Sequence, residues 1–222
     1  MHIPTKVFKR VFHAGLLDGA PPAGSRFSQE GQCLSVSEVP YAWVAIARLG
    51  GSPIWELAKA DNRFLAAHRI SKKLSAVILS WGIDAGYVEM REAWVTNYTQ
   101  QDENGEGFLA EGISLTLDAA IAEYGEVGED DAFEVTAHTP KMLPFPTAKL
   151  EAHAGQKVCL AMAKDMLLMA YADVVLGYDG VFWNETLDID ALSAPRAGIF
   201  RKKVKDWTVT TPTVPLKNYD EY

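Results

Sequence analysis

Hydrophobic and polar positions alternate over several short stretches of the chain, and such alternation predicts strands separated by turns. Residues 6–13 mix apolar and basic side chains and predict a strand that ends at Ala14-Gly15. Residues 32–36 alternate like a short half-buried strand, and Ser37 is well placed to cap a helix that runs to about Leu49. Residues 54–57, 133–138 and 180–183 also have strand composition, and 198–211 predict one or two closing strands.

Apolar residues at helical spacing predict three further helices. Residues 58–79 fit a mostly helical segment, and 114–124 fit a helix that is opened by Ser114 or Thr116. Residues 157–175 are apolar nearly all round, which predicts a helix buried in the core. Residues 88–98 fit either a helix or a strand. The segment with three prolines at 140–146 is expected to be irregular. Short strands mixed with irregularly placed helices indicate the α+β class.

The composition narrows the class of protein. A chain of 222 residues with 48% hydrophobic and 23% charged residues predicts one globular domain, 1–222. No apolar run of 18 residues is present, and no apolar stretch typical of a signal peptide follows the basic residues near the start. We therefore expect a cytoplasmic protein that does not enter a membrane. The formal charge of −8 argues against broad binding to a phosphate backbone.

Several common catalytic motifs are missing from the sequence. It has no phosphate-binding loop, no glycine-rich dinucleotide fingerprint, no zinc-protease motif and no serine-hydrolase elbow. The five histidines lack metal-ligand spacing, so no metal site is expected. The two cysteines, Cys33 and Cys159, are widely separated in apolar stretches and are expected to be buried, unpaired side chains.

Three separate segments carry the remaining candidates for chemistry. Residues 11–15 place His13 at the end of a strand, and Gly15 two positions later lets a ligand approach the backbone. Residues 31–37 form the second segment and run into the aromatic side chains at 41 and 43. Residues 176–185 read as a helix end, a tight turn and a strand that leads into an acidic loop.

Together these segments resemble the ADP-ribosyltransferase fold family, especially its phage-encoded and toxin-type members. The resemblance touches about residues 11–48 and 157–200, and the usual tyrosine-rich second motif is replaced here by Leu34-Ser35-Val36-Ser37. It implies an α+β fold with a split β-sheet core, helices and a long middle insertion. We place this insertion at residues 58–146, where it is the natural candidate for target recognition.

The same resemblance implies transfer of ADP-ribose from NAD to a macromolecular target, either a host protein or a nucleic acid. NAD would be a consumed substrate, with nicotinamide released. Departure of nicotinamide leaves positive charge on the ribose, and a carboxylate that binds the ribose hydroxyls stabilises that charge. The resemblance assigns this catalytic role to Glu185, with Asp188 as the substitute.

The resemblance also implies the contacts with NAD. His13 would hydrogen-bond the ribose on the adenosine side, Gly15 and Ser35 would contact NAD, and Tyr41 or Trp43 would offer an aromatic face to nicotinamide.

Each of these residues also has a purely structural interpretation. His13 fits a satisfied core histidine, Ser35 a strand residue, and the aromatic residues 41 and 43 core packing. Exposed carboxylates such as 185 and 188 are common in loops. Asp179 is expected to form a turn, and Arg196 is expected at the surface, with contact to the NAD phosphates as its alternative.

Two other functions remain open at this stage. One is an NAD glycohydrolase on the same fold, in which water replaces the acceptor. The other is a non-enzymatic, phage-encoded inhibitor or interaction protein, a function that the acidic composition also fits.

Overall fold

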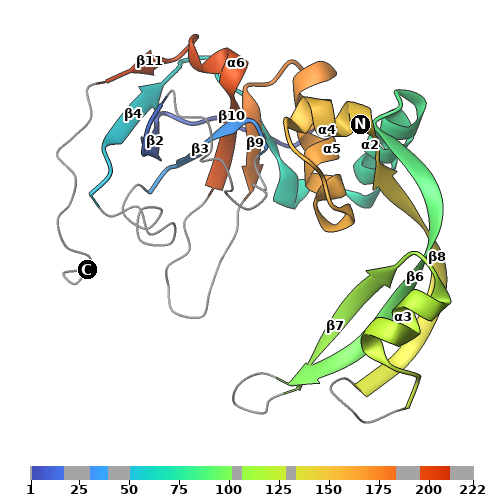
Figure 1. Cartoon of the computed structure of the whole chain (residues 1–222). Helices are drawn as coiled ribbons and strands as arrows, with labels where there is room; N and C mark the ends of the chain where they lie inside the picture. Colours follow the sequence, from blue (N-terminus) through green and yellow to red (C-terminus); the bar gives the residue numbers. More distant parts are fainter. Residues whose placement is uncertain are drawn as a thin grey trace. The chain divides into compact units, whose positions relative to one another are not determined.

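Figure 1 shows the computed structural model, which describes residues 2–17, 31–39, 51–101, 107–128, 134–183 and 196–210. Contacts divide the chain into two compact units. The first unit comprises Met1–Val88 and Pro146–Tyr222, and the second comprises Glu89–Phe145. Helices and sheets are both present, which places the fold in the α+β class. None of the described helices is both long enough and apolar enough to cross a membrane.

The first unit is built on an eight-stranded sheet in the order β1-β5-β9-β10-β3-β2-β4-β11. The strands are β1 (Thr5–Lys6), β2 (Val11–Ala14), β3 (Cys33–Ser37), β4 (Ile54–Ala58), β5 (Phe64–Ala66), β9 (Gly180–Trp183), β10 (Arg196–Phe200) and β11 (Thr208–Val209). Only β5 and β9 pair in parallel, and every other neighbouring pair is antiparallel. The pairing between β2 and β3 consists of one residue pair, Phe12 with Ser37.

Most of the predicted strands are confirmed. The strand predicted before Ala14-Gly15 is present as β2, and β3, β4 and β9 occupy the segments where alternation indicated strands. The expectation of a mostly helical segment at 58–79 is wrong for Phe64–Ala66, which forms β5. These three residues are at most 1% exposed because β5 lies between β1 and β9, and an apolar run that is buried on both faces suits an interior strand.

The helices of the first unit pack around this sheet. They are the 3₁₀ turn η1 (Ala67–Arg69), α2 (Lys72–Asp84), α4 (Ala148–Ala154), α5 (Leu160–Val174) and the short α6 (Arg201–Val204). Of these, α2, α4 and α5 cover one face of the sheet. Figure 1 shows α2, α4 and α5 gathered beside β9, and α5 contacts all three of these elements. The prediction that α5 is a buried core helix is confirmed, since Met166, Met169 and Ala170 are each at most 2% exposed.

The opposite face of the sheet has its own apolar cluster, which includes Leu34, Val36 and Leu57. Aromatic rings dominate it: Phe64 meets Phe8 edge-on, with ring centroids 4.8 Å apart, and Trp207 at 6.0 Å. Edge-to-face contacts of this kind add to the stabilisation from burial alone. The sheet of the first unit is therefore buried on both faces.

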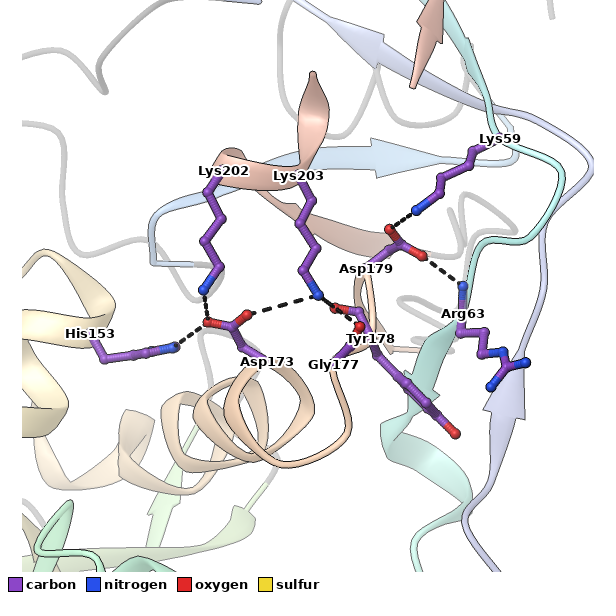
Figure 2. Close-up of polar contacts among 9 residues, drawn as sticks. All are labelled: Lys59, Arg63, His153, Asp173, Gly177, Tyr178, Asp179, Lys202 and Lys203. Atoms are coloured by element: carbon purple, nitrogen blue, oxygen red, sulfur yellow. Dashed lines mark hydrogen bonds and ion pairs between the residues drawn. The ribbon is translucent and has the colours of Figure 1, made fainter. Parts of the chain in front are cut away.

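Asp179 joins the middle strands of the sheet, as Figure 2 shows. Its Oδ1 accepts a hydrogen bond from Lys59 Nζ at 2.7 Å, and its Oδ2 accepts one from the backbone N–H of Arg63 at 2.9 Å. The backbone N–H of Asp179 donates to the Arg63 carbonyl, and its carbonyl accepts from the N–H of Phe200. Asp179 therefore does more than form the expected turn. Its buried carboxylate also fixes the connection between β4 and β5 against β9.

The second unit is a three-stranded sheet with one helix. Its elements are β6 (Val88–Gln101), β7 (Gly107–Ser114), α3 (Leu117–Tyr124) and β8 (Glu134–Pro146), in the sheet order β7-β6-β8. Of the two residues expected to open the helix, Thr116 is the cap, because its hydroxyl accepts a hydrogen bond from Ala119 N–H. The Tyr124 ring packs against Gly112 and stacks on Tyr98, with centroids 5.0 Å apart.

The expectation that the proline-rich segment at 140–146 is irregular is wrong. Strand β8 continues through it to Pro146. The reason is its place in the sheet: β8 is an edge strand that pairs only with β6, so residues without an N–H can face outward without breaking a ladder. Prolines on an edge strand also hinder pairing with a second sheet.

Charge is divided unevenly between the two units. The second unit contains thirteen Asp and Glu residues against two Lys and Arg residues, a formal charge of −11. The first unit has nineteen basic and sixteen acidic residues, a formal charge of +3. The acidity noted from the sequence therefore belongs to one part of the chain. Within the expected insertion at 58–146, residues 58–88 belong to the first unit.

Asp179→Asn tests the role of the buried carboxylate. It leaves the Lys59 ammonium without its charged partner, and we expect the free energy of unfolding to fall by about 2 kcal/mol. Urea unfolding followed by circular dichroism measures this change. Asp206→Asn is the matched control, since this exposed carboxylate should change stability by less than about 0.5 kcal/mol. Equal effects of the two substitutions would contradict the assignment.

Candidate functional site

One row of paired residues crosses five strands of the first unit at the end of β9. Trp183 pairs with Arg196, Arg196 with Ser37, Ser37 with Phe12, and Phe12 with Glu56. The connections that carry the candidate residues begin next to this row, because residue 184 follows Trp183 and residue 38 follows Ser37. Glu185, Asp188, Tyr41 and Trp43 themselves lie outside the described residues.

Arg196 is buried, which corrects the expectation that it lies at the surface. It is 8% exposed, and its guanidinium carbon lies 5.1 Å from the centroid of the Trp183 ring. Arginine is rarely buried unless it is paired, and the aromatic face of Trp183 is one of the contacts of this guanidinium. One feature of the sequence indicated that Arg196 is buried, the apolar run from Ala197 to Phe200. When a strand is fully buried, its first residue is buried as well.

Trp183 adds a second polar group at the same place. The residue is 6% exposed, and its indole Nε1 is buried without a hydrogen-bond partner among the described residues. A buried indole N–H ordinarily finds an acceptor, and leaving it without one carries a free-energy penalty. The Arg196–Trp183 pair therefore presents a cation and an N–H donor, both of which suit an anionic or carbonyl ligand.

His13 lies one residue beyond this row and is 9% exposed. Its Nδ1 lies 2.8 Å from the carbonyl oxygen of Ser35, and its Nε2 lies 3.3 Å from that of Leu16. A neutral imidazole carries one N–H, so only one of the two carbonyls can receive a proton. We assign the proton to Nδ1 because its contact is the shorter one. The lone pair of Nε2 then faces the Leu16 carbonyl oxygen, so a ligand hydroxyl can donate to it only by taking the place of that oxygen.

Burial controls the charge of His13. Desolvation is the largest effect and lowers its pKa below the ordinary value, and the Arg201 charge acts in the same direction. The bonds to the Ser35 and Leu16 carbonyls raise the pKa and offset part of this shift. The imidazole is therefore neutral at physiological pH and acts as a hydrogen-bonding group.

Gly15 lies two positions after His13 in the sequence and next to it in the structure. Its φ of 117° is a conformation that side chains rarely adopt, and a Cβ built there would lie 3.6 Å from His13 Nε2. Trp55 Nε1 donates to the Gly15 carbonyl at 2.9 Å, which fixes this turn against β4. Trp55 was not among the sequence candidates, because tryptophan in an alternating strand is usually a core residue.

Ser35 and His13 are brought together only through the backbone. Side chains alternate along strands, and the neighbours of Ser35, Leu34 and Val36, belong to the cluster that also contains Val11. The Ser35 hydroxyl consequently lies on the helix-covered face, whereas the His13 ring lies on the face of Val11. The structure places His13 and Gly15 side by side and the Ser35 side chain across the sheet from them.

No group of three or more His, Cys, Asp or Glu side chains within the described ranges could hold a metal ion. Neither Cys33 nor Cys159 forms a disulfide. Cys33 is buried as expected, but Cys159 is exposed, because it precedes the first residue of α5 and lies outside the helix core.

Comparison with known proteins adds no assignment: no family model, curated protein or solved structure matches the chain.

His13→Gln tests the buried, neutral histidine. The unfolded chain has an ordinary histidine pKa of about 6.5, so below this pH the unfolded state binds more protons than the folded state. The stabilisation is therefore complete above about pH 6.5 and is lost as the pH falls toward the lowered pKa of the folded protein. We expect urea unfolding at about pH 7.5 and about pH 5.5 to show a smaller stability difference for the variant than for the wild type.

His68→Gln is the comparison for this experiment. The pKa of His68 is also lowered, by desolvation and by the Arg69 and Lys6 charges, but its side chain is less buried. We expect a smaller effect than that of His13→Gln. If the His13 variant keeps the full pH dependence of the wild type, the imidazole is not the group responsible.

Proposed function

We propose that the chain transfers ADP-ribose from NAD to a macromolecular target and releases nicotinamide. The observation that carries this proposal is the order of the strands. The three sequence segments that resemble the ADP-ribosyltransferase family lie far apart in the chain, yet they contribute β2, β3 and β9, which β10 joins into four consecutive strands, β9-β10-β3-β2. Motifs that are scattered in the sequence but adjacent in the fold support the resemblance more strongly than scattered motifs alone.

The form of the sheet supports the split core that this family implies. Among the described residues, β2 and β3 share one ladder pair, Phe12–Ser37, and the His13 ring adds a contact to the Ser35 carbonyl. The junction between the two parts of the sheet is therefore short. His13 and Gly15 lie one and three residues after Phe12, so this proposal places the adenosine-side ribose at His13 Nε2, where a ribose hydroxyl takes the place of the Leu16 carbonyl oxygen.

The charge at the end of β9 fits the NAD pyrophosphate. Arg196 supplies a buried guanidinium, and Trp183 supplies an indole N–H next to it. Hydrogen bonds from charged donors to phosphate are stronger than bonds between neutral groups. Trp183 belongs to the core cluster of the helix-covered face and the His13 ring lies on the opposite face, so in this proposal NAD passes over the end of the strands. Arg196 then binds the pyrophosphate, and Glu185, which follows Trp183 by two residues, stabilises the ribose cation as nicotinamide leaves.

One experiment separates transfer, hydrolysis and simple binding. Purified protein is incubated with NAD labelled in the ADP-ribose part, with and without a cell lysate. Label on a protein or nucleic acid supports transfer, whereas free ADP-ribose without lysate identifies an NAD glycohydrolase. Absence of turnover in both arms contradicts the enzymatic proposal and leaves an interaction protein.

Glu185→Gln tests the catalytic carboxylate. We expect nicotinamide release to fall at least about a hundredfold, because the substitution removes the charge that stabilises the transition state. The melting temperature should stay within about 2 °C of the wild type. Asp188→Asn is the parallel variant for the substitute residue, and Glu111→Gln, an exposed position of the second unit, is the control. Wild-type activity in both of the first two variants would remove the assigned role.

Arg196→Lys tests the pyrophosphate contact. Lysine keeps the charge but loses the planar fork and the contact with the Trp183 ring. We expect the KM for NAD to rise about tenfold, with a smaller change in kcat. Arg63→Lys serves as the control because Arg63 is exposed and only its backbone joins the Asp179 interactions. An unchanged KM would show that Arg196 does not bind NAD.

A further inference from the structure

A pocket of about 250 Å³ lies among β3, β10 and the helices of the first unit. Its polar wall is formed by Gln32, His153, Asp173, Arg201 and Lys202. Cys33 and Phe200 also line it, and both belong to the core cluster on the helix-covered face. The His13 ring lies on the opposite face, so this pocket is distinct from the site proposed for the adenosine-side ribose.

Asp173 organises the charges of this pocket, as Figure 2 shows. Its side chain is 6% exposed, and its Oδ2 accepts hydrogen bonds from His153 Nε2 at 3.1 Å and Lys202 Nζ at 2.7 Å. Its Oδ1 is buried and has no hydrogen-bond partner among the described residues, and Lys203 Nζ lies 3.9 Å from it. One carboxylate thus contacts the His153 ring and the Lys202 ammonium and faces the Lys203 ammonium.

Positive charge exceeds negative charge around the pocket. Arg201, Lys202 and Lys203 are consecutive in the sequence, and Asp173 is the acidic residue that contacts the two lysines. Burial is the main reason why the pKa of Lys203 is lowered; the Asp173 and Asp179 charges raise it, and the Lys202 and Lys59 charges lower it.

Two of these cations are available to a ligand. Among the described residues Arg201 makes one long hydrogen bond, 3.4 Å from its Nη1 to the Leu17 carbonyl, and a guanidinium has five N–H donors. The Lys202 side chain is 65% exposed although its ammonium group contacts Asp173. Lys203, by contrast, donates to the carbonyl oxygens of Gly177 and Tyr178 and so ties α6 to the turn before β9.

We propose that this pocket binds a phosphorylated small molecule. The phosphate contacts Arg201 and Lys202, and the Gln32 amide serves a further polar group of the ligand. Ala152, Met169 and Phe200 give the pocket an apolar wall, so the ligand carries an apolar body beside its phosphate. A cationic ligand would meet Arg201 and Lys202 directly and is disfavoured. This inference does not depend on the proposed transfer of ADP-ribose.

Binding of three probes at constant ionic strength tests the proposal. Inorganic phosphate represents the anion, phenol the apolar body, and phenyl phosphate both together. We expect saturable binding of phenyl phosphate by isothermal titration calorimetry, tighter than that of phosphate, together with a rise in melting temperature. The NMR signals of the His153 ring should shift during the same titration. Weaker binding of phenyl phosphate than of phosphate would contradict the apolar wall.

Lys202→Gln and Arg201→Gln should each weaken phenyl phosphate binding about tenfold, because each removes one charged hydrogen-bond donor. Lys205→Gln removes the same charge from an exposed position that does not line the pocket, and it should change the affinity less than about twofold. Equal weakening by all three variants would show general charge attraction and overturn the proposal. So would the absence of saturable binding to the wild type, or binding without a shift of His153. Since Lys202 is exposed, its variant tests the site even if Arg201→Gln fails to fold.

Discussion

The Asp179 carboxylate is the contact on which the arrangement of the central strands depends. It lies at the turn between α5 and β9, and it holds the connection between β4 and β5 through the Lys59 ammonium and the Arg63 backbone. Its own backbone also bonds to Arg63 and Phe200. Strands β5 and β9 pair in parallel, an arrangement that no hairpin turn can impose, and the Asp179 carboxylate adds a side-chain contact at the start of this pair.

The row of residues that ends β9 and begins β10 depends on the relative position of these strands. Glycines allow the strands to approach closely, because a Cβ on Gly180 would lie 1.8 Å from the Gly198 carbonyl oxygen. This close packing leaves Trp183 and Arg196 together at the end of the two strands. Their polar atoms are buried by the packing of the sheet, and a buried cation has stronger electrostatic interactions with a ligand than an exposed one. The pairing of β9 with β10 therefore brings the Arg196 guanidinium and the Trp183 indole together.

The sequence predicted local structure better than long-range contacts. Strands β2, β3, β4 and β9 and the buried helix α5 followed from periodicity, since each has a continuous pattern. Strand β5 was missed because three buried residues next to a helix give no period. The prolines of β8 were misread because a sequence does not show which strands lie at an edge. Arg196 was expected at the surface because its partner in β3, Ser37, comes from a segment more than a hundred residues away.

The candidate site followed only in part from sequence. His13 and Gly15 were identified and lie side by side, because they are close in sequence and share one turn. The alternation of β3, which predicted the strand correctly, also places the Ser35 hydroxyl on the other face from His13. The Asp173 pocket was not anticipated, because its polar residues come from α4, α5, α6 and the position before β3, and none of the three helices shows a motif.

The uneven division of charge gives salt opposite effects on the two units. Within Glu89–Phe145 the thirteen acidic residues repel one another, and dissolved ions screen that repulsion, so added salt favours the folded form of this unit. In the first unit, attraction dominates at contacts such as Asp173 with Lys202, and the same ions weaken it. Ionic strength therefore shifts the balance of stability from one part of the chain to the other without any change in sequence.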